Sequence, residues 1–417
     1  MKQLRSWLIP AAFIFAILAN AARAQQSPPS PRVADLKSAD GILLKATYFP
    51  AVNPGPGVLL FHQANRTRTS WDALARQLAV AGINTLTVDN RGHGESGGTD
   101  DYPQADVEAA FQFLTSQPGV QRDEIGLGGA GSLGVINAIQ VAQPHASDIK
   151  SFVMISGDSF RPGIEFLHQA SQLPELFVIA DTDDFPPTVE TMLWLYARSS
   201  SPMRKLIRYP AAQDAPWLWY ETSNPNRVPP TGSHGTDLFM THPDLPGIVV
   251  DWFVTTLIKT PGHAPIDPLA ASAILNQLEV PDGVAQVTHE LLEARKRDRQ
   301  AQLWPEVCLD NIGSGHINEA DSEEKAGHLP AAVAERKAAI EIFKLNLLAY
   351  PDSADAHFNL ADAYFQDGQK ALARQLAQEA LALLDAHKVP LSSWSDTEER
   401  RAEIRQGIEG VLKKTAP

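Results

Sequence analysis

The stretch LLFHQANRTRTSWDALARQLAVAGINTLTVDNRGHGES, residues 59–96, decides the fold. Its two ends belong to short apolar runs, Val58–Phe61 and Ile83–Val88, and each run is followed by polar residues. Between them, Trp71–Ala81 carries apolar residues at helical spacing. Two buried strands joined by a helix predict parallel pairing, because a parallel pair needs a crossover of this length. We therefore expect an α/β protein.

The same alternation extends in both directions from this stretch. Arg32–Lys37 and Ile42–Phe49 flank a hairpin signal, Ala39-Asp40-Gly41. Further apolar runs of strand length follow at Ile125–Gly128, Phe152–Ile155, Phe177–Ala180 and Leu206–Tyr209. The series predicts a mainly parallel, doubly wound sheet over residues 32–258. In such sheets the ligand site lies beyond the carboxyl ends of the strands.

Three kinds of reactive side chain follow these predicted strands. Ser132 follows the fifth strand, Asp183 and Asp184 follow the seventh, and His234 comes after the last. A serine, an acid and a histidine in this order match the chain order of the α/β-hydrolase triad. The sequence therefore predicts a nucleophilic hydrolase site at this edge of the sheet.

On these residues, the segment 32–258 resembles α/β-hydrolases. Residues 59–96, together with GSHGTDL at 232–238, are similar to the branch of dienelactone hydrolases and small serine esterases. The resemblance implies a serine hydrolase that cleaves a carboxylic ester or related acyl substrate through an acyl-enzyme. Ser132 would attack, His234 would transfer the proton, and backbone N–H groups of Gln63 and Leu133 would hold the oxyanion, so the side chains of those two residues would matter little.

The nucleophile has two alternative registers. The pattern G-x-S-x-G becomes Ala130-Gly131-Ser132-Leu133-Gly134 in this chain. We favour Ser132, because Gly134 is then kept downstream and the predicted helix starts in the right place. A gapless alignment from Ile125 instead puts Gly131 at the nucleophile position and leaves no nucleophile there.

The identity of the triad acid is also open between two neighbouring aspartates. Counting from the seventh strand in the G-x-x-D manner, with Asp181 in the Gly place, favours Asp184 over Asp183. An aspartate here also caps the following helix readily.

Two segments bear on the substrate. Only a short helix around Ile164–Ser171 fits between the sixth and seventh strands, so we expect an open pocket without a large lid. The long insertion Ala211–Thr231 precedes His234 and contains Trp217 and Trp219. These rings are expected either to form a wall of the acyl or alcohol pocket or to fix the loop to the domain surface.

Composition and motifs predict no cofactor, no metal and no nucleic-acid partner. The formal net charge is −14, and acidic residues outnumber basic ones on both sides of residue 260, which disfavours phosphate binding. The glycine-rich segment Gly126–Gly134 lacks the acidic residue that a dinucleotide site needs after the next strand. Metal-ligand spacings are missing from the sequence.

The amino terminus predicts export. Lys2 and Arg5 precede the apolar run Trp7–Ala19, and Ala22-Arg23-Ala24 fits signal-peptidase cleavage, so residues 1–24 read as a signal peptide. The apolar run is shorter than a membrane span of about 20 residues. We expect a periplasmic or secreted protein with a flexible lead-in at 25–31 and no membrane span after cleavage. Cys308, the single cysteine, cannot form an intramolecular disulfide.

The carboxy-terminal third predicts a separate helical region. Residues 259–269 read as a linker, and residues 270–417 have helical periodicity. Ala354–Leu384 resembles one tetratricopeptide repeat, with Leu360, Ala361, Tyr364, Gly368, Ala373 and Ala380 at its packing positions. We expect this region to dock on the hydrolase domain or to bind a partner protein or a second copy. The alternative to an enzyme is therefore a catalytically inactive hydrolase fold that binds partners through this tail.

Overall fold

The computed structural model describes most of the chain beyond the predicted signal segment. The described residues are 27–99, 103–157, 160–199, 201–210, 233–260, 266, 277–278, 280, 282–299, 301–386 and 398–416.

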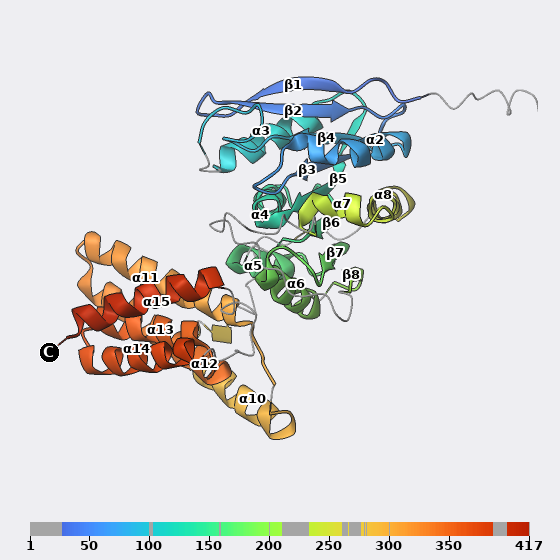
Figure 1. Cartoon of the computed structure of the whole chain (residues 1–417). Helices are drawn as coiled ribbons and strands as arrows, with labels where there is room; N and C mark the ends of the chain where they lie inside the picture. Colours follow the sequence, from blue (N-terminus) through green and yellow to red (C-terminus); the bar gives the residue numbers. More distant parts are fainter. Residues whose placement is uncertain are drawn as a thin grey trace, which may run out of the picture.

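One eight-stranded sheet organises the first part of the chain, with the strand order β1-β2-β4-β3-β5-β6-β7-β8 (Figure 1). The strands β1 and β2 are antiparallel to their neighbours, and the remaining pairs are parallel. The strand bounds are Arg32–Lys37, Leu43–Phe49, Gly55–Phe61, Asn84–Val88, Val120–Ala130, Ile149–Ile155, Glu175–Ala180 and Arg204–Tyr209 for β1 to β8. All eight predicted strands are present, so the predicted fold class is confirmed.

Helices cover both faces of this sheet. One face packs against α3 (Gln104–Thr115), α4 (Gly131–Ala142), α5 (Phe160–Gln169) and α6 (Pro186–Arg198). The other face packs against α2 (Asp72–Val80), α8 (Leu245–Phe253) and the π-helix Val254–Lys259. The short helix α7 (Leu238–Thr241) lies beside α8. Two short 3₁₀ turns, Arg68–Trp71 and Gly235–Asp237, follow strand ends. We call residues 32–259 the sheet domain.

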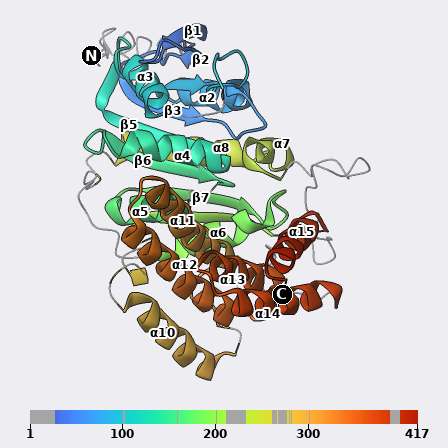
Figure 2. The same ribbon diagram turned by 90° about the vertical axis from the view of Figure 1, so that its left-hand side faces the viewer.

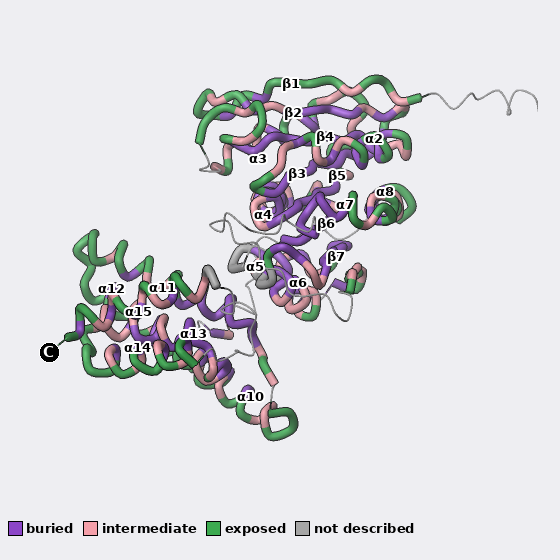
Figure 3. Tube along the Cα trace, in the orientation of Figure 1, coloured by how far each residue is buried: buried purple, intermediate pink, exposed green. Residues whose placement is uncertain are grey.

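The central strands are buried on both sides, which explains their continuous apolar runs (Figure 3). In β3 and β7 every residue is buried. Strands between two helical layers have no solvent face, so they need no alternation of polar and apolar residues.

The structure describes six helices in the second part, which we call the helical region (residues 282–416). Their bounds are Gly283–Arg297, Glu306–Lys325, Leu329–Ala349, Ala354–Gln366, Lys370–Asp385 and Glu398–Lys414 for α10 to α15. The hairpin of α13 and α14 lies where the repeat was predicted, with Ala361, Ala373 and Ala380 buried together. Gly368 has a φ of 80° between these helices. The helices are thus confirmed, whereas the tetratricopeptide identity stays a prediction.

The helical region docks on the sheet domain through α5 and α6 (Figure 2). Apolar side chains of α11 and α12 belong to the same hydrophobic core as one face of the sheet. The indole Nε1 of Trp194 donates to the Leu303 carbonyl at 3.0 Å, and its ring lies 4.8 Å from that of Trp304. Among the described helices, none combines the length and the apolar character required to cross a membrane.

Candidate active site

A buried histidine–aspartate pair lies beyond the carboxyl ends of the strands. His234 Nδ1 is 2.9 Å from Asp183 Oδ1, and the two side chains are 10% and 0% exposed. Asp183 N–H donates to the Ala180 carbonyl at 3.0 Å, so the chain turns directly after β7. This turn places Asp183, and not the predicted Asp184, in the hydrogen bond to the imidazole. The same Asp183 oxygen accepts the N–H of Phe185 at the start of α6.

The surrounding acids favour the charged form of the imidazole. Burial lowers the pKa of His234, but the negative charge and hydrogen bond of Asp183, with smaller effects of Asp184 and Asp237, outweigh it and raise the pKa above its ordinary value. The Asp183 hydrogen bond also fixes the ring so that Nε2 faces away from the carboxylate. An imidazole held in this way is a suitable general base.

Gly131 stands at the sharp turn between β5 and α4, opposite this imidazole. Its φ is 62°, the left-handed conformation of a strand-to-helix elbow. A Cβ atom placed on Gly131 would lie 3.1 Å from His234 Nε2. The gapless register therefore holds in the structure, and Gly131 occupies the position that was predicted for Ser132. Ser132 is the next residue, partly buried in the first turn of α4.

Tight packing fixes this elbow in place. Side chains at Gly129 and Gly134 would overlap the facing backbone, and one at Gly157 would lie 2.5 Å from the carbonyl carbon of Gly131. Glycine at these positions lets the strand, the helix and the next strand end approach closely. Close packing therefore explains why these positions are glycine, independently of which residue stands at the elbow.

The side chain of Gln63 braces the histidine loop. Its Nε2 donates to the His234 carbonyl at 3.2 Å, and its Oε1 accepts from the N–H and the hydroxyl of Thr236 at 3.2 and 3.0 Å. The Gln63 side chain thus has a structural role beside the oxyanion role predicted for its backbone N–H, which stays a prediction. Gln63 Cβ is also 2.5 Å from the Cβ position of Gly131, so Gln63 occupies part of the room that a side chain there would need.

A second brace joins the same two loops. Arg66 Nε lies 2.7 Å from Asp237 Oδ1, and Nη2 lies 2.5 Å from Oδ2, a bidentate pair. Phe185 packs edge-on against the His234 ring at a centroid distance of 4.7 Å. These contacts cannot be predicted from the sequence, because Arg66 and Asp237 are 171 positions apart in the chain.

His62, directly after β3, holds a loop near the site. The fully buried His62 accepts the Asn90 N–H at Nε2, at 3.0 Å. Burial lowers the pKa of His62 to about 4, so its ring is neutral at physiological pH. This hydrogen bond fixes the segment after β4 against the end of β3.

Among the described residues, one group of carboxylates is close enough together to hold a metal ion, and it lies in the helical region. It consists of Glu306, Asp310 and Asp355. Arg400 donates to both oxygens of Asp355 at 2.9 and 2.8 Å, and Asn346 and Asn359 both donate to Asp310. These partners account for the cluster as a buried polar network.

Several predicted features lie outside the described residues. These are Trp217 and Trp219 of the insertion, the signal peptide 1–24 and most of the linker 259–269. Their roles stay predictions.

Comparison with known proteins agrees with the fold. Residues 56–339 match the family model described as the Alpha/beta hydrolase family, so the match crosses the predicted boundary at 258 and ends within α12. No curated protein matched.

Several solved structures match about half of this chain. They include an esterase from Pyrococcus furiosus (16% identity, TM-score 0.41, 55% of this chain and 91% of that one). They also include a dienelactone hydrolase from Anabaena variabilis (18% identity, TM-score 0.39, 56% of this chain and 100% of that one). Similarities this low show nothing about the activity of this chain.

Proposed function

Since the chain belongs to the alpha/beta hydrolase family, we propose that it hydrolyses a carboxylic ester or a related acyl compound at the pair of His234 and Asp183. One observation carries the proposal: His234 Nε2 lies 3.1 Å from the position that a Cβ atom on Gly131 would occupy. In a hydrolase of this fold, the atom that attacks the acyl carbon starts from this place.

The elbow residue sets the mechanism. Gly131 offers no side chain, so the attacking oxygen is that of water. His234 Nε2 takes a proton from the water, whose oxygen bonds to the acyl carbon, and the oxyanion accepts hydrogen bonds from the backbone N–H groups of Gln63 and Ser132. Collapse of this intermediate breaks the ester C–O bond, and His234 returns the proton to the alcohol. The products are a carboxylic acid and an alcohol, and no acyl-enzyme forms.

Two other candidates each have an observation in their favour. Ser132 directly follows the elbow and is partly exposed, so a serine mechanism through an acyl-enzyme is the second candidate. The crowding of Gln63 against Gly131 favours the third, a non-catalytic fold that binds partners, with the helical region as its interaction surface.

Hydrolysis of p-nitrophenyl esters with short and medium acyl chains separates the three. For attack by water, His234→Ala loses about 10²-fold or more in rate, Ser132→Ala keeps most of its activity, and a fluorophosphonate probe leaves the protein unlabelled. The surface variant His289→Ala serves as the histidine control and keeps full activity.

The competing outcomes are equally distinct. A burst of nitrophenol, labelling of Ser132 and loss of both in Ser132→Ala would establish the serine mechanism instead. A folded protein that hydrolyses no ester faster than its His234→Ala variant would support the binding protein.

We also propose that the protein acts after export. The support is the pattern of residues 1–24, with its positive start and small residues before Gln25. Mass spectrometry of the protein from the extracytoplasmic fraction should find Gln25 as the first residue. An intact Met1 in that fraction would contradict cleavage.

A further inference from the structure

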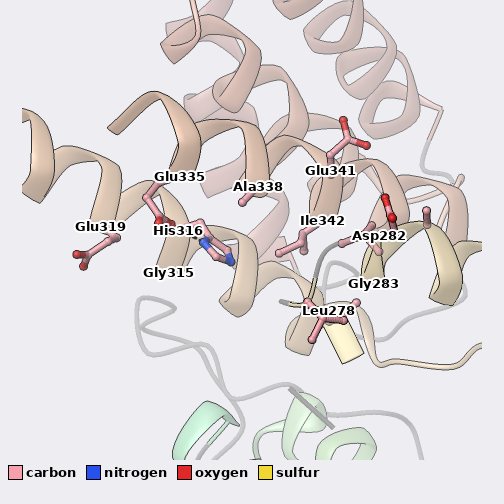
Figure 4. Close-up of a pocket in the computed structure, with 13 residues that line it drawn as sticks. Leu278, Asp282, Gly283, Gly315, His316, Glu319, Glu335, Ala338, Glu341 and Ile342 are labelled. Carbon is pink, nitrogen blue, oxygen red and sulfur yellow. Dashed lines mark hydrogen bonds and ion pairs between the residues drawn. The ribbon is translucent and has the colours of Figure 1, made fainter. Parts of the chain in front are cut away.

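A cavity lies in the helical region, apart from the proposed catalytic residues (Figure 4). Its volume is about 830 Å³, and residues of α10, α11 and α12 line it. This volume is within the range of small-molecule sites, roughly 300–1,000 Å³. The apolar part of its wall includes Leu278, Ala338 and Ile342.

The charged groups around the cavity are all acidic, apart from one histidine. They are Asp282, Glu319, Glu335 and Glu341, and none of the lining residues that the structure describes is a lysine or an arginine. Glu335 is 2.6 Å from His316 Nδ1, and Glu341 pairs with Lys344 at 2.7 Å. The structure shows no ion pair for Asp282 or Glu319, so the cavity keeps a negative charge.

The acids lie at both ends of the apolar part. Figure 4 shows Glu319 and Glu335 on one side, Asp282 and Glu341 on the other, and Ala338 and Ile342 between them. Glu335 and Glu341 are six residues apart on α12, about 9 Å along the helix axis. Two separated negative ends with an apolar middle are complementary to a linear cation with an amine at each end.

A glycine on α11 keeps the cavity open. A Cβ atom on Gly315 would meet nothing within 4 Å, whereas one on Gly313, two residues earlier, would overlap the Phe343 ring. Packing therefore explains Gly313 but not Gly315. Because Gly315 lines the cavity, a large side chain at this position would project into it.

We propose that this cavity binds a linear di- or polyamine. Its ammonium groups pair with the acids at the two ends, and its methylene chain lies along Ala338 and Ile342. The negative charge excludes anionic ligands, and the apolar wall distinguishes an organic amine from a simple metal cation.

Titration calorimetry of the whole protein with spermidine and with 1,8-diaminooctane tests the proposal. Both should bind at a single site, and binding should weaken as salt increases. Gly315→Phe fills the cavity without changing its charge and should weaken binding about tenfold or more. Glu319→Gln should weaken it about threefold, as expected for one partly screened charge.

Two matched controls separate a built site from attraction to an acidic surface. Gly410→Phe, on α15 where a Cβ atom also meets nothing within 4 Å, and Glu409→Gln should bind like the unchanged protein. Equal binding by Gly315→Phe and Gly410→Phe would overturn the proposal, as would no heat from either amine or binding of a lysine-rich peptide in their place. If Gly315→Phe does not fold, judged by circular dichroism, the comparison of Glu319→Gln with Glu409→Gln decides.

Discussion

In the proposed mechanism, Gly131 decides which atom attacks the acyl carbon. A glycine tolerates the φ of 62° at the elbow without strain, and it leaves no side chain between the strand end and His234. The space is shared with Gln63, whose Cβ would be 2.5 Å from a Cβ at residue 131. The substitution Gly131→Ser alone would therefore force Gln63 to shift and would strain the backbone.

The charge of Asp183 should appear in the pH profile of hydrolysis. Only neutral His234 can accept a proton, so kcat/KM should rise with pH through the pKa of His234, which lies above the usual value of about 6.5. Asp183→Asn removes the largest stabiliser of the imidazolium. Its rising limb should move to lower pH, and its rate should fall about 10²-fold.

Asp181→Asn is the control for this profile, because Asp181 pairs with Arg208 and not with His234. The rise of kcat/KM with pH in Asp181→Asn should occur at the same pH as in the unchanged protein. A limb of Asp183→Asn that moved to higher pH would contradict the assignment of Asp183 as the partner.

Glu175 is a buried carboxyl group that should make stability depend on pH. Burial raises its pKa to about 8, against about 4.3 in the unfolded chain. A raised folded-state pKa means that its stabilising contribution is complete below pH ~4.3 and is lost as the pH rises to about 8. Glu175→Gln should therefore raise the free energy of unfolding at pH 8 by at least about 1 kcal/mol.

Urea unfolding at pH 5 and pH 8 measures this effect. The difference between Glu175→Gln and the unchanged protein should be smaller at pH 5, whereas the exposed variant Glu409→Gln should show little difference at either pH. A stabilisation that is larger at pH 5 than at pH 8 would be inconsistent with a buried, neutral Glu175.

At the scale of elements, α11 contains two glycines with opposite roles. Gly313 lets α11 approach the Phe343 ring of α12, and Gly315 faces open space. Gly315→Ala should stabilise the protein by about 1 kcal/mol through helix propensity. Gly313→Ala should destabilise it by about 1–3 kcal/mol, because the new methyl group overpacks the contact.

The two variants are each other's control in thermal unfolding, since the chemical change is the same. Opposite shifts of Tm are expected. Shifts of the same sign would show that α11 and α12 are not packed as described.

At the scale of the whole molecule, the sheet domain and the helical region share one hydrophobic core. Trp304 is 2% exposed, and its ring lies against Trp194 of α6. The helical region therefore packs on the helix that begins just after Asp183.

Trp304→Ala should destabilise the protein by about 3–5 kcal/mol and make the connection between the two parts sensitive to protease. Leu292→Ala, at a side chain that is 45% exposed, should change the stability by less than about 0.5 kcal/mol. Limited proteolysis and urea unfolding provide both readouts. Unchanged protease resistance in Trp304→Ala would contradict a shared core.

The sequence by itself determined the eight strands, the helices between them and the edge of the sheet where His234 lies. These follow from apolar periodicity and from residues at strand ends, which are local properties of the chain. Residues 56–339 also match the alpha/beta hydrolase family.

Only the tertiary structure decided which neighbours meet across that edge. The turn after β7 selects Asp183 over Asp184, and the start of α4 puts Gly131 rather than Ser132 opposite Nε2. Neither choice is visible in sequence, because a shift of one residue leaves the local pattern intact but turns the side chain to another direction. Gln63 shows the same limit, since its bond to the His234 loop joins residues 171 positions apart.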